Sequence, residues 1–120
     1  MSRSADDVFE DHLRCRSVGD VEADLERNYA DDIVLLCECG ALEGRKAVRE
    51  SARRLGLQLP DAEFQFPTKE VRGEYAFLVW TARSQQYEVD HGVDSFVIRE
   101  GRIVVQSIFY RLSRGNLGDE

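Results

Sequence analysis

Several kinds of segment are missing from this sequence, and their absence narrows the class of protein. No apolar run comes near the ~20 residues that a helix needs to cross a bilayer. The first residues, Met1 to Asp7, also lack the apolar core of a signal peptide, so we expect a cytoplasmic protein with no membrane partner. Repeats and linkers are absent too, and a chain of 120 residues then predicts one domain with a modest core.

Residues that commonly hold metals are scarce. The chain has two histidines and three cysteines, Cys15, Cys37 and Cys39, without the ligand spacing of a zinc site. The odd number of cysteines argues against a disulfide scaffold, and we interpret all three as small buried apolar side chains. Cys37 would act as a nucleophile only if it were exposed beside a cation. We expect neither a metal nor another cofactor.

Basic residues are also fewer than acidic ones. The 16 basic residues are outnumbered by 23 acidic ones, which gives a net charge of −7. Proteins that bind phosphate backbones need a positive footprint, so nucleic acid and anionic membranes are not expected partners. Five basic residues gather at positions 45–54. We interpret them as the solvated face of a helix, with an anion site as the alternative.

Three stretches carry apolar residues at helical spacing. The first helix is capped by Ser4, the second follows a break at Gly19-Asp20, and the third runs from Gly44 to a stop at Pro60. Each helix has one apolar side, which favours packing against a common core. These sides consist of Val8, Phe9, His12 and Leu13, then Val21, Leu25 and Tyr29, then Val48, Ala52, Leu55 and Leu59.

Strand patterns fill the rest of the chain. A polar turn at Asp31-Asp32 precedes the first strand, and Pro67 indicates an edge strand or a bulge in the second. Helices and strands that do not alternate as βαβ predict an α+β fold, with a bent antiparallel sheet around the helices. We expect strands at 33–39, 62–71, 75–86, 87–99 and 102–112, a core over about 5–112, and a mobile tail at 113–120.

Asp94 is a polar exception within the strand expected at 87–99. Side chains alternate along a strand, so Asp94 shares a side with Phe96 and Ile98 that should face a core or cavity. A buried carboxylate without a partner costs several kcal/mol, so this group must be paired, protonated or functional. We interpret Asp94 as the mark of a ligand pocket. The alternative is a structural bond to a backbone amide, His12 or Tyr110.

Two of the expected strands are apolar on both faces. On the strand expected at 75–86, the faces carry Phe77, Val79 and Thr81 against Leu78, Trp80 and Ala82. A single layer of helices covers only one face of a sheet, so the other face needs a second cover. The simplest cover is another copy of the chain. We therefore predict a homodimer through the outer face of the sheet.

Four segments occur in an informative order and spacing. They are Ser17-Val18-Gly19-Asp20-Val21, Asn28-Tyr29-Ala30-Asp31-Asp32, Leu42-Glu43-Gly44-Arg45-Lys46-Ala47-Val48-Arg49 and Asp94-Ser95-Phe96-Val97-Ile98-Arg99-Glu100-Gly101-Arg102-Ile103. Together they resemble the nuclear transport factor 2-like (NTF2-like) superfamily, which includes SnoaL-like proteins and ketosteroid isomerases. The resemblance covers about residues 5–112. It implies a cone-shaped fold, in which three N-terminal helices pack on a strongly curved antiparallel or mixed sheet around a pocket, often in a dimer.

The resemblance to ketosteroid isomerases extends to one site residue. Those enzymes use an aspartate base, with a tyrosine and a protonated aspartate as donors to the oxyanion. Asp94 resembles the protonated aspartate, because it lies in the same Asp-x-Phe context. His12 stands at the tyrosine position and Cys37 at that of the base, while Glu38 points the other way. Two of the three roles therefore differ, which argues against steroid isomerisation.

The candidate catalytic residues are Asp94 and His12, which we expect to face each other across the pocket. A carboxylate beside an imidazole fixes its tautomer and makes it an acid or base near neutral pH. A hydrogen-bonded core histidine is the alternative for His12, and His91 is expected at the rim. The candidate ligand-binding residues are Cys37, Trp80, Phe96 and Tyr110.

Three functions stay open at this point, because a fold of this kind hosts many activities. The chain binds a small apolar molecule, or it moves a proton on an apolar carbonyl compound as an isomerase, cyclase or dehydratase. The third alternative is a structural or protein-interaction dimer whose pocket is vestigial. The unmatched base and tyrosine positions favour binding over catalysis.

Overall fold

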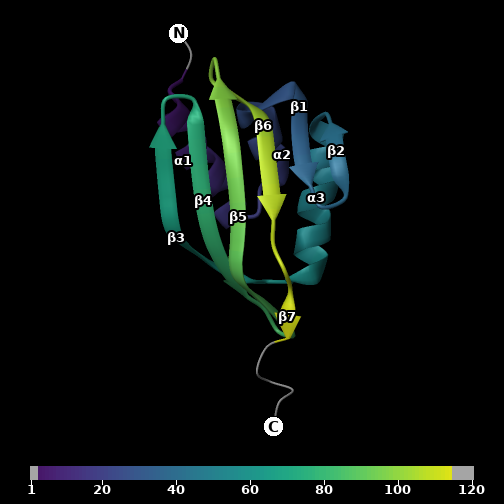
Figure 1. Cartoon of the computed structure of the whole chain (residues 1–120). Coiled ribbons are helices and arrows are strands. Elements are labelled where there is room, and N and C mark those ends of the chain that lie inside the picture. Colours follow the sequence, from purple (N-terminus) through teal and green to yellow (C-terminus); the bar gives the residue numbers. More distant parts are fainter. Residues whose placement is uncertain (1–2, 115–120) are drawn as a thin grey trace.

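The computed structural model describes residues 3–114, which form three helices and seven strands (Figure 1). In chain order they are α1 (Ala5–Ser17), α2 (Val21–Asn28), β1 (Tyr29–Cys37), β2 (Gly40–Glu43), α3 (Arg45–Gln58), β3 (Glu63–Arg72), β4 (Tyr75–Arg83), β5 (Tyr87–Arg99), β6 (Arg102–Phe109) and β7 (Ser113–Arg114). None of these helices combines the length and apolar character needed to span a bilayer.

All three helices begin at the predicted residues, and at two of them a side chain satisfies a free backbone N–H group. Oγ of Ser4 accepts a hydrogen bond from the backbone N–H of Asp7 at 3.1 Å and starts α1. The Asp20 carboxylate accepts one from the backbone of Ala23 at 3.1 Å and starts α2. Gly44 precedes α3 with a φ of 98°, a backbone conformation that a side chain would strain.

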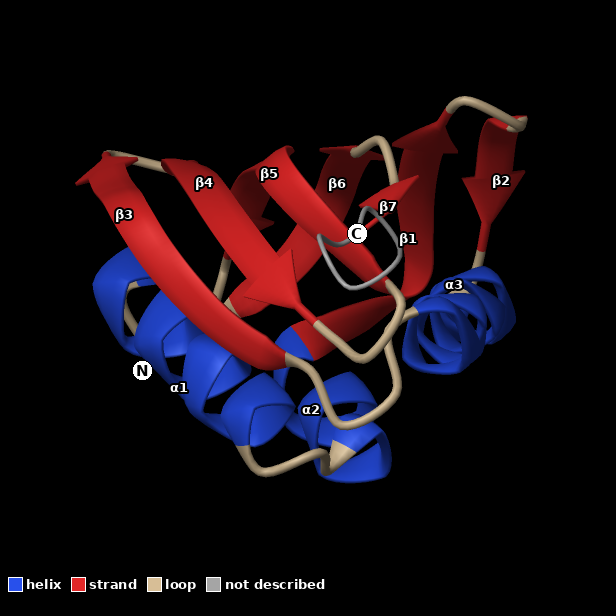
Figure 2. Ribbon diagram, turned by 90° about the horizontal axis from the view of Figure 1, so that it is seen from below, coloured by secondary structure: helices blue, strands red, loops and turns tan. Residues whose placement is uncertain are grey.

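The strands form one mixed sheet in the order β2-β1-β6-β5-β4-β3, with β7 paired to β5. Strands β3 to β6 are the predicted antiparallel meander, and β1 adds to β6 in parallel. Figure 2 shows all of the helices on the same side of this curved sheet. The α+β cone predicted from the sequence is thereby confirmed.

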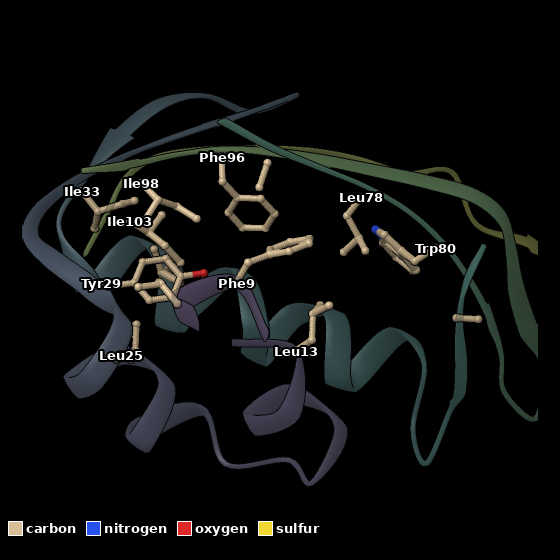
Figure 3. Packing of buried hydrophobic residues seen from close by; sticks show 14 of the residues in the cluster. Phe9, Leu13, Leu25, Tyr29, Ile33, Leu78, Trp80, Phe96, Ile98 and Ile103 are labelled. Atoms are coloured by element: carbon tan, nitrogen blue, oxygen red, sulfur yellow. The ribbon is translucent and has the colours of Figure 1, made fainter. Parts of the chain in front are cut away.

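The core fills the space between the helices and the inner face of the sheet (Figure 3). Phe9 of α1 meets Phe96 of β5 edge to face, with ring centroids 5.5 Å apart. Tyr29 and Ile103 lie beside them without solvent exposure. Burying a large apolar side chain contributes about 1.5–3 kcal/mol, so this cluster provides most of the force that holds helices and sheet together.

Pro67 lies where its chemistry predicts. Strand β3 is at the edge of the sheet, and its pairing with β4 shifts register between Gln65 and Thr68. Proline cannot donate a ladder hydrogen bond, so both the edge and the irregularity accommodate it.

The chain departs from the sequence-based expectations around β1 and at the C-terminal end. Tyr29 starts β1 instead of ending a helix, and Asp31-Asp32 lie within β1 with exposed side chains instead of forming a turn. The short, exposed strand β2 was not predicted, because it has no buried face to set a pattern. The predicted tail began at 113, but β7 occupies 113–114 and 115–120 lie outside the described residues.

Candidate functional site

Asp94 lies on the inner face of the sheet, as strand parity predicts. It is only 5% exposed, and its neighbours along β5, Phe96 and Ile98, are 2% and 3% exposed. Directly opposite it across the sheet are Leu78 of β4 and Ile108 of β6. The carboxyl group therefore enters an apolar environment, where a charge without partners would be strongly destabilising.

Two donated hydrogen bonds meet the carboxyl group of Asp94. Nε1–H of Trp80 donates to Oδ1 at 2.9 Å, and the Nε2 amide of Gln106 donates to Oδ2 at 2.8 Å. Burial raises the pKa of Asp94, and these two hydrogen bonds oppose that rise. Asp94 is thus a paired buried group, although its partners are neither of the side chains, His12 and Tyr110, considered from the sequence.

Gln106 extends this pairing to Tyr29 on β1. The phenol of Tyr29 donates to Oε1 of Gln106 at 2.5 Å, while the amide nitrogen of Gln106 faces Asp94. The donor on one side and the acceptor on the other set the orientation of the Gln106 amide. Burial raises the pKa of Tyr29, so its hydroxyl keeps the proton that it donates. A continuous polar chain crosses β1, β6 and β5 inside the cone.

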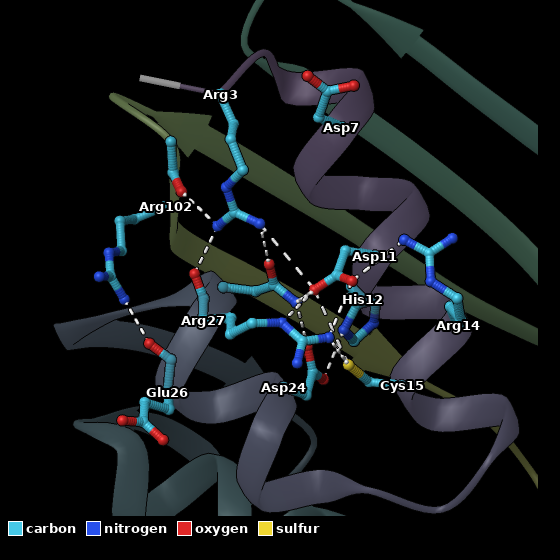
Figure 4. A network of polar contacts seen from close by, with 12 residues as sticks. Arg3, Asp7, Asp11, His12, Arg14, Cys15, Asp24, Glu26, Arg27 and Arg102 are labelled. Carbon is cyan, nitrogen blue, oxygen red and sulfur yellow. Dashed lines mark hydrogen bonds and ion pairs between the residues drawn. The ribbon is translucent and has the colours of Figure 1, made fainter. Parts of the chain in front are cut away.

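His12 lies on the inner side of α1 and is 4% exposed. Its Nδ1 is 2.8 Å from Oδ2 of Asp24 on α2 (Figure 4). Asp24 also accepts hydrogen bonds of 2.8 Å from Nε of Arg16 and from the Asn28 amide. Burial alone would raise the pKa of Asp24, but the interactions with His12, Arg16 and Asn28 outweigh burial and lower that pKa.

The contact with Asp24 sets the tautomer of His12. Because a carboxylate only accepts hydrogen bonds, Nδ1 carries a proton, and Nε2 of a neutral imidazole is then left as a base. The ring packs edge-on against Phe96 and Tyr29, with centroids 5.2 Å and 5.9 Å away. Within the described residues, His12 and Asp94 each bond to other groups and not to each other. Their pairing as acid and base stays a prediction.

A second buried carboxylate strengthens the contact between α1 and α2. The Arg27 guanidinium donates to both oxygens of Asp11, at 3.0 Å and 2.9 Å, and the Asn28 amide adds a hydrogen bond of 2.9 Å. The bonds from Arg27 hold the pKa of Asp11 well below its usual range. Asn28 therefore links Asp11 to Asp24, and a network of polar contacts joins the helix that carries His12 to α2 (Figure 4).

The candidate ligand-binding residues divide into two groups. Cys37 and Tyr110 line a hollow of about 340 Å³ between α3 and the end of β6, together with polar and apolar neighbours. Trp80 and Phe96 are buried in the core instead. The two groups meet where the Tyr110 ring lies 5.5 Å from the Trp80 ring. The other lining residues of the hollow include Ser51, Arg54, Gln58 and Ile108, and the Tyr110 hydroxyl donates to Gln58.

The cysteines have three different environments. Cys15 is buried, Cys37 is half-buried at the end of β1, and Cys39 is exposed in the turn before β2. The interpretation of all three as buried apolar side chains is therefore wrong for Cys39, because the unpredicted β1–β2 hairpin places it at a turn. Residues 3–114 contain no group of three or more His, Cys, Asp or Glu side chains placed to hold a metal ion.

Solved structures similar to this chain share its fold. An NTF2-like protein of unknown function from Cytophaga hutchinsonii is 9% identical, with a TM-score of 0.72 over 92% of this chain and 93% of that one. A candidate SnoaL-like polyketide cyclase from Mesorhizobium loti is 15% identical, with a TM-score of 0.64 over 90% and 100%. A candidate ketosteroid isomerase from Kribbella flavida is 12% identical, with a TM-score of 0.74 over 89% and 77%.

At sequence identities this low, the comparison with these structures concerns the fold alone. It shows that the chain has the NTF2-like fold. The family model of the SnoaL-like domain matches residues 9–106, and the chain belongs to that family. The resemblance read from the four sequence segments is confirmed. No curated protein matches the sequence.

Proposed function

We propose that this chain binds a small, mainly apolar molecule that enters through the hollow between α3 and the end of β6. One observation carries the proposal: Tyr110 in the wall of the hollow packs on Trp80, and Trp80 donates to the buried Asp94. The hollow is therefore separated from the polar chain inside the cone by two aromatic side chains. Its volume of about 340 Å³ is in the usual range of ligand pockets.

We favour binding over catalysis as the function, because Asp94 already accepts hydrogen bonds from two donors and lies behind Trp80. Apolar side chains and a few polar groups are the usual lining of a ligand site, and Ile108 with Arg54 and Gln58 supply that mixture here. Such a site suits a molecule with an apolar body and one oxygen-bearing end, for which Arg54 is a donor.

Proton transfer on an apolar carbonyl compound is the second candidate function, with isomerase, cyclase or dehydratase chemistry. Burial raises the pKa of Asp94 and so favours the protonated form that donates to a carbonyl oxygen. His12, held by Asp24 with Nδ1 protonated, supplies a base at Nε2. The candidate polyketide cyclase and candidate ketosteroid isomerase of the same fold make this class of reaction the first to test.

The outer face of the sheet supports a homodimer. Three large apolar side chains lie there in the open, Tyr75, Phe77 and Phe109, with 62%, 41% and 44% exposure. Tyr75 and Phe77 border a shallow hollow of about 350 Å³ with Val97 and Val105, on the face that the helices leave uncovered (Figure 2). A second copy of the chain would bury this patch. Analytical ultracentrifugation of the chain at micromolar concentration tests whether the dimer forms. Phe77→Glu should then yield monomers, whereas a monomeric unmodified chain contradicts the dimer.

The ligand proposal is tested by thermal shift with a panel of apolar carbonyl compounds, since binding to the folded state raises the melting temperature. At least one compound should stabilise the chain, and Tyr110→Ala should abolish that shift. Tyr75→Ala is the matched control, because Tyr75 lies on the opposite face, and it should keep the shift. A shift that survives Tyr110→Ala would place the ligand elsewhere.

Catalysis is separated from binding with a compound found in this way. Asp94→Asn keeps the size of the side chain but removes its acid, so turnover should collapse while the thermal shift persists. Unchanged turnover in Asp94→Asn removes Asp94 from any catalytic role. If a bound compound is not turned over by the unmodified chain, binding alone is left as the function.

A further inference from the structure

Cys37 and Cys39 line the hollow described above and are brought together by a tight hairpin, but the proposed function does not use their thiol chemistry. Cys37 ends β1 and pairs with Gly40 at the start of β2, so Glu38 and Cys39 form the turn between the strands. Gly40 takes a φ of 134°, a backbone conformation that other residues rarely adopt. The turn folds Cys39 back over the end of β1, next to Cys37.

The two thiols are in direct contact, with 2.7 Å between their sulfur atoms. Cys37 also donates weakly to the carbonyl oxygen of Gly40 at 3.7 Å, a contact within the same hairpin. Cys39 is exposed and Cys37 is half-buried, so a small reagent can reach the Cys39 sulfur while the Cys37 sulfur lies next to it. This is the arrangement in which an intramolecular reaction outpaces one with a second reagent molecule.

A cation also lies beside the pair. Arg54 of α3 lines the same hollow as both cysteines, and a nearby cation favours the reactive thiolate. The hydrogen bond with Cys37 raises the pKa of the Cys39 thiol, and Arg54 opposes that rise. Cys15 differs because it is buried between α1 and α2, and burial raises the pKa of its thiol.

We propose that Cys37 and Cys39 form a reversible redox dithiol that exchanges with small-molecule disulfides, a reaction beyond the ligand binding proposed above. The thiolate of Cys39 attacks one sulfur of the reagent, forming a mixed disulfide and releasing one reagent thiol. The Cys37 thiol then gives up its proton and attacks Cys39, which forms the Cys37–Cys39 bond and expels the second reagent thiol. The protein loses two protons and two electrons, and the reagent disulfide gains them.

Oxidised glutathione is the probe, applied to the reduced full-length chain under native conditions. Titratable thiols, counted after denaturation, should fall from three to one, and the intact mass should fall by two hydrogen atoms. Peptide mapping should locate the new bond between residues 37 and 39. Excess reduced dithiol should restore all thiols. A chain that keeps its thiols, or that accumulates glutathione adducts on both cysteines, overturns the proposal.

Variants separate the paired reaction from the reactivity of one exposed thiol. Cys37→Ser should retain a glutathione adduct on Cys39, because no second thiol is present to displace it. Cys15→Ser, the matched control in the buried position, should still form the intramolecular bond.

Gly40→Ala tests the turn, because it keeps both thiols and its added Cβ would meet no atom within 4 Å. Its unsuitable φ should separate the thiols and leave the mixed disulfide in place. Rapid ring closure in Gly40→Ala would show that the hairpin does not position the pair.

Discussion

His12 and Asp24 bond across the interface between α1 and α2, with Nδ1 and Oδ2 2.8 Å apart and both side chains almost fully shielded from solvent. The Asp24 carboxylate thus depends on partners from both helices, since Arg16 comes from α1 and Asn28 from its own helix. A buried charge that loses one of its partners is strongly destabilising. The pair therefore holds α1 in place as well as orienting the imidazole.

Replacing His12 with alanine should lower the free energy of unfolding by about 2–4 kcal/mol, because it removes a partner of Asp24 and leaves a cavity against Phe96. Urea denaturation at neutral pH measures the loss. His91→Ala, at an exposed position, is the matched control and should stay within about 0.5 kcal/mol of the unmodified chain. Equal effects of the two substitutions would contradict a structural role for the contact with Asp24.

Asp94→Asn should change how stability depends on pH. Because burial raises the pKa of Asp94, the folded chain binds that proton more tightly than the unfolded chain does. The ionised group therefore destabilises the fold above its folded pKa, and this penalty disappears below the unfolded value of about 4. Relative to the unmodified chain, Asp94→Asn should thus lose stability as the pH falls through the raised folded pKa towards about 4.

Urea unfolding of both chains across this range gives the comparison. Asp90→Asn, at an exposed position of the same strand, is the control for general effects of charge. A difference between Asp94→Asn and the unmodified chain that does not vary with pH would mean that Asp94 is not perturbed by its burial.

Gly92→Ala should displace the Trp80 ring. A Cβ at position 92 would lie 2.1 Å from Cε2 of Trp80, so the ring must move away from its bond with Asp94. We expect a loss of about 3 kcal/mol in unfolding free energy. The chain has a single tryptophan, so a red shift of its emission reports the movement.

Gly56→Ala is the matched control for that substitution. A Cβ at position 56 meets nothing within 4 Å, and alanine inside α3 should add about 0.5–1 kcal/mol because it favours the helix. An unchanged emission spectrum and stability in Gly92→Ala would show that the ring does not pack on β5 at this point.

Tyr29→Phe should cost about 1–2 kcal/mol in unfolding free energy. The substitution keeps the ring in the core but removes the hydroxyl that donates to Gln106, and the buried amide oxygen then lacks a donor. Tyr75→Phe removes a hydroxyl from a position that is 62% exposed and should have little effect. Equal stability of Tyr29→Phe and the unmodified chain would mean that Gln106 finds another donor.

The sequence predicted β5 well and β1 poorly, for physical reasons. Strand β5 ends at the Glu100-Gly101 turn, where both residues have positive φ, and its alternation placed Asp94 correctly on the inner face. In β1, the exposed Asp31-Asp32 pair broke the apolar pattern without breaking the strand. Local pattern cannot show that pairing with β6 before and after this pair, at Tyr29 and from Val34 on, continues the strand across it.

The partners of Asp94 could not be read from the sequence, because they depend on register between strands. Trp80 lies opposite Gly92, and Gln106 lies opposite Phe96, so both reach Asp94 as diagonal neighbours on the inner face. Gln106 did give a usable signal, since it is a lone amide in an apolar strand, as Asp94 is a lone acid. Asp24 was hidden among the other acidic residues of α2.

The parallel pairing of β1 with β6 joins segments from opposite ends of the chain. During synthesis, the first helices and the β1–β2 hairpin emerge from the ribosome well before β6 has been translated. The β6 side of β1, which includes Leu35, therefore has no partner strand until most of the chain exists. Closure at such a distance slows folding, and the uncovered segment is open to association with other nascent chains. A small domain of this topology depends on the completion of its own C-terminal half.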